Sequence, residues 1–443
     1  MTYSPEGYIL RVVKMVRFFI EKAKNTRRLF SKEKQQFHTW WRWNRYFRQL
    51  RRLAKEIRKK EEIKVLFIAF NLSNWKHDSL FRAMQAHSRF SPSILIVPEM
   101  QVTALEQREQ KMWMLMEYCR KNNYPFFTLC NTDGDTQGKS IPAEYDILIY
   151  AKPYLGAVPA SLDYPLYRDR LLLAIHYACH SVDADWVCNQ PYQKWAWMDF
   201  YENDPTAKGS ALYKECGKRN NVVTGLPVFD AFMLPPTANP WKAQSGNPKK
   251  IIWAPHWTLP TSKSWLGCYS NFLSMAEPMR NLAKTTQGTF QWAFKPHPLL
   301  KHTLYSHPDW GKAKTDEYWE WWAMQINTQL EEGEYSDLFQ TSDAMIHDSC
   351  SFSCEYHFTG KPVLFICNNI EQHIKGLNDM ATAGFLAQYI GKGMEEVKIF
   401  LHETLLQSID PKRNTRLEFR ARYLLPPKGQ TAADNIIHAI LYR

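Results

Sequence analysis

The sequence predicts an α/β protein made of two parallel-sheet halves in tandem, and three observations predict it. Short apolar runs alternate with helical segments, which is typical of parallel strands joined by right-handed crossovers. This pattern starts again after a proline-rich segment at residues 235–248. The 443 residues are 45 % hydrophobic and 23 % charged, the composition of a globular chain too long for one ordinary domain. We therefore expect domains at residues 61–234 and 235–443, preceded by a separate arm at residues 1–60.

The first half opens on an apolar run at residues 63–70, which follows a charged run and is typical of a buried parallel strand. Further strands are expected at residues 94–97, 125–129, 145–150 and 171–175, and helices at residues 78–86 and 104–122. In the second half, strands are expected at residues 251–254, 290–295, 344–347 and 362–366. Open α/β sheets bind ligands beyond the carboxyl ends of their strands, so the two halves predict a ligand cleft between them.

The arm carries all of the excess positive charge. Residues 1–60 hold 18 of the 56 Lys and Arg residues and 4 of the 44 acidic residues, whereas the rest of the chain is close to neutral. Apolar and basic residues alternate at helical spacing over residues 9–20, and aromatic residues alternate with arginines over residues 38–52. Trp and Tyr favour the bilayer interface, and Lys and Arg are attracted to anionic headgroups. We therefore expect helices that lie on an anionic membrane surface. The expected contact residues are Arg11, Lys14, Arg17, Trp40, Trp41, Arg42, Trp43 and Arg45.

Two other interpretations of the arm are open: its aromatic side chains could pack on the protein body, or its bases could bind RNA. A nucleic-acid binder more often spreads its bases over a folded face, so no nucleic-acid partner is expected. No run reaches the roughly 18 apolar residues of a membrane span. The nine cysteines form no C-x-x-C pair, which favours reduced thiols over disulfides or a zinc site. Together these features predict a peripheral protein on the cytoplasmic face of the cell membrane.

Three segments with polar side chains follow expected strands of the second half. The first ends in His256, and the second places Lys295 and His297 in a Lys-Pro-His-Pro run whose prolines restrict the backbone. The third runs from strand to Ser-rich turn to helix, with Gly360 as the expected C-cap. A Ser-rich helix start offers N–H groups, hydroxyls and a positive dipole end to a phosphate. The plainer alternatives are loop histidines and serines that only cap a helix, but three serines exceed what one cap needs.

These segments carry a family resemblance. The chain has Ala-Pro-His, then Lys-Pro-His-Pro, then Ser-Asp-Ala-Met-Ile-His-Asp-Ser-x-Ser-Phe-x-x-Glu-Tyr-x-x-Thr-Gly-Lys-Pro-Val at residues 342–363. This order resembles the CDP-glycerol glycerophosphotransferase family, which contains teichoic acid primases and polymerases and related capsule polymerases. The resemblance covers roughly residues 63–430. It implies a GT-B fold, in which two Rossmann-like domains face an interdomain cleft and the cytidine nucleotide binds the C-terminal one.

The resemblance also implies site residues. On the donor side, the family's basic-residue-Pro-His motif falls on Lys295 and His297, which implies contact with the donor diphosphate. The other donor-site or phosphate-binding residues expected are His256, Asp348, Ser349, Ser351 and Glu355. On the acceptor side, teichoic acid polymerases carry Trp-His-Gly-Thr-Pro, whereas this chain has Ala-Ile-His176-Tyr-Ala-Cys-His180. His176, which directly follows an expected strand, is the first candidate for the general base, ahead of His180 and other residues such as His256. Two structural histidines in a loop are the plainer alternative.

The resemblance implies a transferase of cell-envelope polymer synthesis. A hydroxyl on a membrane-linked, lipid-linked acceptor would attack the β-phosphorus of a CDP-activated polyol, CDP-glycerol first among the candidates, and CMP would leave. Two alternatives remain open: a GT-B glycosyltransferase that uses a nucleotide sugar and a lipid-linked glycan, and a non-catalytic nucleotide-dependent membrane adaptor. No cofactor beyond the CDP-activated substrate is firmly implied. No residue is assigned to a metal site, because an Asp-x-Asp match at residues 183–185 is too short to be specific, and the sequence leaves a requirement for a divalent metal open.

Overall fold

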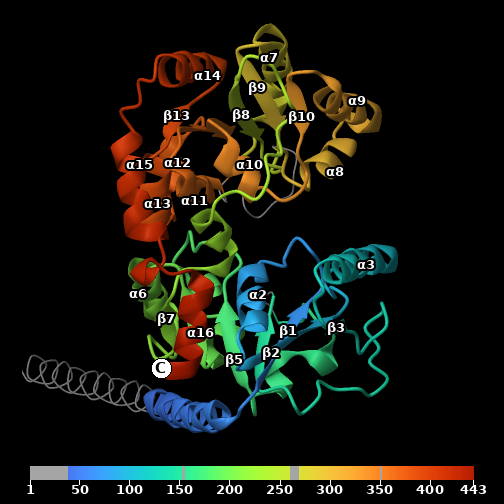
Figure 1. The fold of residues 1–443 in the computed structure, drawn as a ribbon, viewed down its shortest axis with the longest axis vertical. Helices are drawn as coiled ribbons and strands as arrows, with labels where there is room; N and C mark the ends of the chain where they lie inside the picture. The colour runs from blue at the N-terminus through green and yellow to red at the C-terminus, as the bar shows by residue number, and fades with distance from the viewer. Residues whose placement is uncertain (1–37, 152–154, 260–268, 350–351) are drawn as a thin grey trace, which may run out of the picture. The chain divides into compact units, whose positions relative to one another are not determined.

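The computed structural model describes residues 38–151, 155–259, 269–349 and 352–443 (Figure 1). The chain divides into two compact units, Met1–Lys59 and Lys60–Arg443. In the larger unit the described residues form two all-parallel sheets, one of seven strands and one of six. The predicted α/β class with two parallel-sheet halves is therefore confirmed.

The first sheet has the strand order β3-β2-β1-β4-β5-β6-β7. Its strands are β1 (Ile63–Ala69), β2 (Phe90–Ile96), β3 (Phe126–Phe127), β4 (Ile147–Tyr150), β5 (Leu171–Ile175), β6 (Met198–Tyr201) and β7 (Asn221–Val223). The helices along this part of the chain are α2 (Asp78–Ala86), α3 (Leu105–Lys121), α4 (Asp185–Cys188), α5 (Pro191–Trp195) and α6 (Asp204–Tyr213). Strand β1 is wholly apolar after Lys64 because it pairs with β2 and β4 on its two edges and is covered on both faces.

The second sheet has the strand order β10-β9-β8-β11-β12-β13. Its strands are β8 (Lys249–Ala254), β9 (Phe290–Phe294), β10 (Thr328–Leu330), β11 (Ala344–His347), β12 (Val363–Ile366) and β13 (Tyr389–Gly391). The helices are α7 (Phe272–Thr285), α8 (Leu300–Tyr305), α9 (Gly311–Met324), α10 (Ser336–Thr341), α11 (Phe352–Glu355), α12 (Ile370–Ile374), α13 (Asp379–Leu386), α14 (Met394–Ile399), α15 (Arg413–Phe419) and α16 (Ala432–Tyr442). Trp253, Phe294 and Trp322 belong to the aromatic core that joins this sheet to α7 and α9.

The C-terminal helix α16 returns to the first half. It packs against α2, and the backbone N–H groups of Ala432 and Ala433 donate to the carboxylate of Asp230, at 2.7 and 2.9 Å. Asn435 donates from Nδ2 to the carbonyl of Thr224. The predicted boundary between residues 234 and 235 separates the strands of the first sheet from those of the second. That each side is a domain of its own stays a prediction.

In the smaller unit, residues 38–59 form one continuous helix. Trp40 and Trp41 are about half exposed, at 52 % and 48 %, and Arg42 and Arg45 are exposed, whereas Trp43 is buried. Of the expected membrane contacts, Arg11, Lys14 and Arg17 lie outside the described residues. Among the described helices we find none that is both long and apolar enough to cross a membrane.

His77, at the start of α2, is a fully buried histidine whose ring packs against those of Phe67 and Trp75, and neither ring nitrogen has a partner among the described residues. Burial lowers its pKa from 6.5 to about 4. The unfolded chain therefore binds a proton at pH 5 that the folded chain rejects, and stability is lost as pH falls below about 6.5. The expected loss is about 2 kcal/mol at pH 5 and almost none at pH 8.

We predict that His77→Met raises the free energy of unfolding, relative to the unsubstituted protein, by about 2 kcal/mol more at pH 5 than at pH 8. Urea denaturation at the two pH values measures the difference. The same change at both pH values would show that His77 does not titrate in this way.

Candidate functional site

The three polar segments of the second half meet at one edge of its sheet. Strands β9, β8 and β11 are neighbours in the sheet and all run parallel, so their carboxyl ends lie side by side. His256 follows β8, Lys295 and His297 follow β9, and Asp348 and Ser349 follow β11. The structure therefore brings the predicted donor-side residues together at the edge where open α/β sheets bind their ligands.

His256 and His297 form a pair, with ring centroids 4.9 Å apart in an edge-to-face arrangement. The N–H of Leu299 donates to Nδ1 of His297 at 3.1 Å, and the N–H of Thr258 donates to Nδ1 of His256 at 3.3 Å. The Thr258 hydroxyl also lies 2.8 Å from Nδ1 of His256, and it can donate its hydrogen there because its oxygen accepts the N–H of Tyr269. Burial lowers the pKa of His256 to about 3, with the neighbouring His297 adding to it, and burial and Lys295 lower the pKa of His297 to about 4. Both rings are therefore neutral at pH 7 and carry their proton on Nε2. Among the described residues neither Nε2 has a hydrogen-bond partner, so the pair offers two N–H donors to a ligand.

Asp348 has a different position from the one expected of a ligand contact. Its Oδ1 accepts the N–H of His256 and its Oδ2 accepts the N–H of Asn271, both at 2.6 Å. Burial raises the pKa of this carboxyl to about 7, although the N–H donors oppose the rise. Both oxygens are thus used to hold the His256 loop against the start of α7. Ser349 is buried beside it, and Ser351 lies outside the described residues.

Glu355 and Lys295 are connected through Tyr335. The Tyr335 hydroxyl donates to Oε2 of Glu355 at 2.6 Å, and the Lys295 ammonium lies 5.2 Å from the Tyr335 ring centroid and donates to the carbonyl of Gly333. Lys76, from the loop between β1 and α2 of the first half, lies 5.5 Å from the same ring. Burial lowers the pKa of Lys295 to about 8 and raises that of Glu355. Two lysines from different halves therefore flank one aromatic ring at this edge of the sheet.

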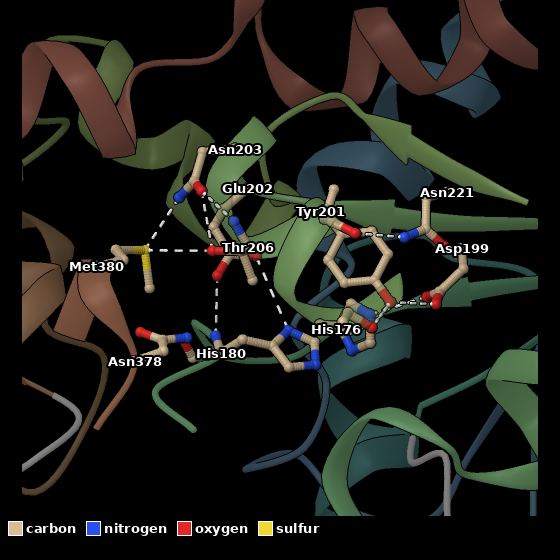
Figure 2. A network of polar contacts seen from close by, with 12 residues as sticks. His176, His180, Asp199, Tyr201, Glu202, Asn203, Thr206, Asn221, Asn378 and Met380 are labelled. Atoms are coloured by element: carbon tan, nitrogen blue, oxygen red, sulfur yellow. Dashed lines mark hydrogen bonds and ion pairs between the residues drawn. The ribbon is translucent and has the colours of Figure 1, made fainter. Parts of the chain in front are cut away.

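His176, the first residue predicted for the acceptor side, directly follows β5 and forms a buried pair with Asp199 of β6 (Figure 2). Its Nε2 lies 2.8 Å from Oδ1 of Asp199, while the Tyr201 hydroxyl and the Lys214 ammonium donate to Oδ2 at 2.6 and 2.8 Å. Although burial opposes ionisation, Lys214 and His176 hold the pKa of Asp199 well below its usual range. The carboxylate thus fixes the proton of His176 on Nε2 and leaves Nδ1 as an acceptor. Nδ1 of His176 has no hydrogen-bond partner among the described residues, and it is not completely buried.

His180 lies beside His176, with ring centroids 4.1 Å apart, and its own backbone N–H donates to Oε1 of Glu202 at 2.9 Å. Its Nδ1 is 3.9 Å from Oε2 of Glu202, and both atoms are buried without a hydrogen-bond partner. Burial lowers the pKa of His176, and the neighbouring His180 adds to it. Cys179, between the two histidines, packs against a core cluster that contains residues of both halves and includes Cys354 of α11. The histidine loop therefore lies beside α11, the short helix that carries Glu355.

Within the described ranges, no group of three or more His, Cys, Asp or Glu side chains is arranged to hold a metal ion. The Asp-x-Asp match is divided between different partners: Asp183 accepts from Asn378, and Asp185 accepts from Asn189.

Five residues of this region were not predicted from the sequence: Lys76, Asp199, Glu202, Lys214 and Tyr335. Nothing in the spacing of the sequence joins Lys76 to residues more than 200 positions away. Asp199 lies in β6 and Glu202 directly follows it. The sequence does not predict this strand because Asp199 interrupts the apolar run that is typical of a buried strand.

No protein-family model matches the chain, and no curated protein matches its sequence. Solved structures resemble it in fold. One is a variant of the wall teichoic acid polymerase TagF, with a TM-score of 0.57, 14 % identity, and coverage of 92 % of this chain and 97 % of that one. Another is TagF soaked with CDPG, with a TM-score of 0.56, 13 % identity, and coverage of 92 % and 98 %.

The UDP-GlcNAc 2-epimerase from Neisseria meningitidis, bound to UDP-GlcNAc, has a TM-score of 0.56 at 15 % identity and covers 86 % of this chain and 100 % of its own. These likenesses confirm the predicted GT-B fold. The structures that share it include a wall teichoic acid polymerase, of the family that the sequence resembles.

Proposed function

We propose that this protein is a transferase that moves a polyol phosphate from a CDP-activated donor, CDP-glycerol first among the candidates, to a hydroxyl of a membrane-linked acceptor. The observation that carries the proposal is one juxtaposition. The strand-end donors His256, Lys295 and His297 are grouped at one edge of the second sheet. His176, which pairs with Asp199 of β6, begins a loop that lies beside α11, a helix of the same half as those donors. A fold shared with TagF and the order of the sequence motifs support the same donor class.

On the donor side, the neutral His256 and His297 rings would each donate an Nε2–H to phosphate oxygens. Lys295 and Lys76 would add positive charge near the diphosphate. When the acceptor oxygen bonds to the β-phosphorus, the bond from that phosphorus to the bridging oxygen breaks, and its electron pair leaves with CMP. Fixed N–H and ammonium groups stabilise such developing charge without reorganising during the reaction.

On the acceptor side, His176 would take the hydroxyl proton on Nδ1. The proton already held on Nε2 by Asp199 stays in place, so the ring becomes an imidazolium that the carboxylate stabilises. This arrangement of base and orienting carboxylate is the general requirement for activating a hydroxyl near neutral pH. The two roles therefore fall to different halves: neutral histidines of the second half donate hydrogen bonds to the donor, and a histidine of the first half accepts the hydroxyl proton.

A panel of binding measurements tests the donor class. Calorimetric titration with CDP-glycerol, CDP-ribitol, UDP-GlcNAc and CMP should show the tightest binding for a CDP-polyol, and His256→Ala should weaken it. A preference for UDP-GlcNAc would instead favour a glycosyltransferase or another nucleotide-sugar enzyme. Tight CDP-polyol binding without any product, in the presence of membranes that hold acceptor, would favour the adaptor.

We also propose that the arm holds the protein on the cytoplasmic face of an anionic membrane. We predict that deleting residues 1–59 abolishes co-sedimentation with vesicles that contain anionic lipid, because the exposed Trp40, Trp41, Arg42 and Arg45 leave with the segment. Lys60 is retained because its ammonium donates to Asp146 in the body.

In the full chain, 1 M salt should also weaken vesicle binding, since it reduces the screening length to about 3 Å. The double variant Arg42→Gln/Arg45→Gln should give an intermediate loss, at about 1 kcal/mol for each base. Vesicle binding by the truncated chain that equals that of the full chain would contradict the prediction.

A further inference from the structure

Asn378, in the second half, holds the histidine loop of the first half. Its side chain caps α13, because Oδ1 accepts the N–H of Ala381 at 2.9 Å. Its Nδ2 donates to the carbonyl of His180 at 2.9 Å and to Oδ1 of Asp183 at 3.2 Å. Its backbone N–H donates to the carbonyl of Ser181, also at 2.9 Å. One buried residue therefore attaches the end of the histidine loop, which belongs to the first half, to α13 of the second half.

A second asparagine makes the reciprocal connection (Figure 2). Asn203 caps α6 in the first half, with Oδ1 accepting the N–H of Thr206 at 2.9 Å. Its Nδ2 reaches the second half, 3.0 Å from the carbonyl of Tyr423 and 3.0 Å from Sδ of Met380. In both residues the amide oxygen makes the local cap and the amide nitrogen makes the contact with the other half. An aspartate could make the cap but could not make the cross-contact.

We propose that Asn378 is a positioning residue that sets the His176–His180 loop relative to the donor-side edge. The proposal rests on the proposed function for the role of those histidines, but the positional claim can be measured without it. His180 is held from both directions: Asn378 binds its carbonyl, and Glu202 binds its N–H. Removing the Asn378 side-chain amide leaves the carbonyl of His180 and the Asp183 carboxylate without this donor. The loop then keeps only the bond from the Asn378 backbone N–H to the Ser181 carbonyl as its connection at this residue, while the β5–β6 side remains.

Substitutions at Asn378 separate the cap from the cross-contact. Asn378→Asp keeps an oxygen for the Ala381 N–H and replaces the donating amide by a second carboxylate next to Asp183. Asn378→Ser keeps a good capping oxygen, adds no charge and is too short to reach the loop. Asn369→Asp is the matched control, because Asn369 caps α12 by accepting the N–H of Gln372 at 3.0 Å and is exposed.

Hydrogen–deuterium exchange of the full chain, followed by mass spectrometry, measures the loop directly. We expect both Asn378 variants to exchange the peptide covering residues 176–183 at least about 10-fold faster than the unsubstituted protein and the Asn369→Asp control. CDP-glycerol affinity should stay within about twofold, because the donor-side residues are not altered. CMP release with acceptor membranes should fall about 10-fold, so that kcat falls without a change in KM for the donor.

Unchanged exchange over residues 176–183 in a variant that remains folded would overturn the proposal. An equal loss of donor affinity and rate would also overturn it, since Asn378 would then act on the donor side. If the unsubstituted protein releases no CMP from CDP-glycerol, the proposed function fails, and the exchange result still decides whether Asn378 holds the loop.

Discussion

His176→Ala is expected to lower the rate of CMP release by about 10²–10⁴-fold, the usual contribution of a positioned general base. The reason is that Asp199 fixes the His176 proton on Nε2 and leaves Nδ1 to accept the proton of the attacking hydroxyl. Affinity for CDP-glycerol should be unchanged, because the donor-side groups lie on the other sheet. Single-turnover release of CMP, together with calorimetric binding, separates the two effects.

The pH dependence gives a second readout for His176. A base works only when neutral, and burial lowers the pKa of His176 below 6.5. The acid limb of the rate profile should therefore fall below pH 6.5, with activity retained at neutral pH. His438→Ala, which removes an exposed histidine on α16, is the matched control and should leave the rate unchanged. Full transfer by His176→Ala would exclude His176 as the base.

His180→Ala should differ from His176→Ala by lowering thermal stability, since the substitution leaves the buried Glu202 without its neighbouring ring.

His297→Ala should reduce turnover by about 10²–10³-fold, the effect of removing one fixed donor from a site of developing negative charge. The ring is held with Nε2–H outward because Leu299 donates to Nδ1, and Lys295 lies two residues away on the same loop. Loss of the ring removes its Nε2–H, and the Lys295 ammonium, which donates to the carbonyl of Gly333, does not lie at that position. Initial rates of CMP release measure the change, and binding of CDP against cytidine shows whether the diphosphate is the group affected.

His297→Gln is the informative companion variant. Its amide nitrogen can occupy roughly the position of Nε2 and restore an N–H donor, so it should recover part of the lost rate. A ring needed only for packing against His256 would not be rescued in this way. Wild-type turnover by His297→Ala would show that the donor site lies elsewhere.

The strands that end in the three polar segments could be predicted from the sequence because each has a clear local pattern. Strands β8, β9 and β11 are short apolar runs that end in polar residues, and the structure places them next to one another. Gly360 has the positive φ of 68° expected of the predicted helix C-cap. The order of strands in the sheet, which makes the three ends neighbours, comes from pairing between distant segments and cannot be read from local patterns.

Other features could not be predicted for physical reasons. Strand β6 carries Asp199 at its centre, and a carboxylate in a fully buried strand is stable there only because Lys214 and His176 compensate it. Strands β7, β10 and β13 are three residues long, too short for a periodic signal. Asp348 was expected to contact phosphate, yet its two oxygens bind backbone N–H groups, a use that depends on a loop 77 residues away.

The most direct test of the proposed function is the identity of the nucleotide that the full-length protein releases from CDP-glycerol in the presence of membranes that contain a lipid-linked acceptor. We predict CMP, in amounts equal to the glycerol phosphate gained by the acceptor, because the bond that breaks lies between the two phosphates. Release of CDP would mean that the bond to the polyol breaks instead. That result would contradict the proposed reaction. The reaction would also be contradicted if the protein consumed a nucleotide sugar and released no nucleotide from CDP-polyols.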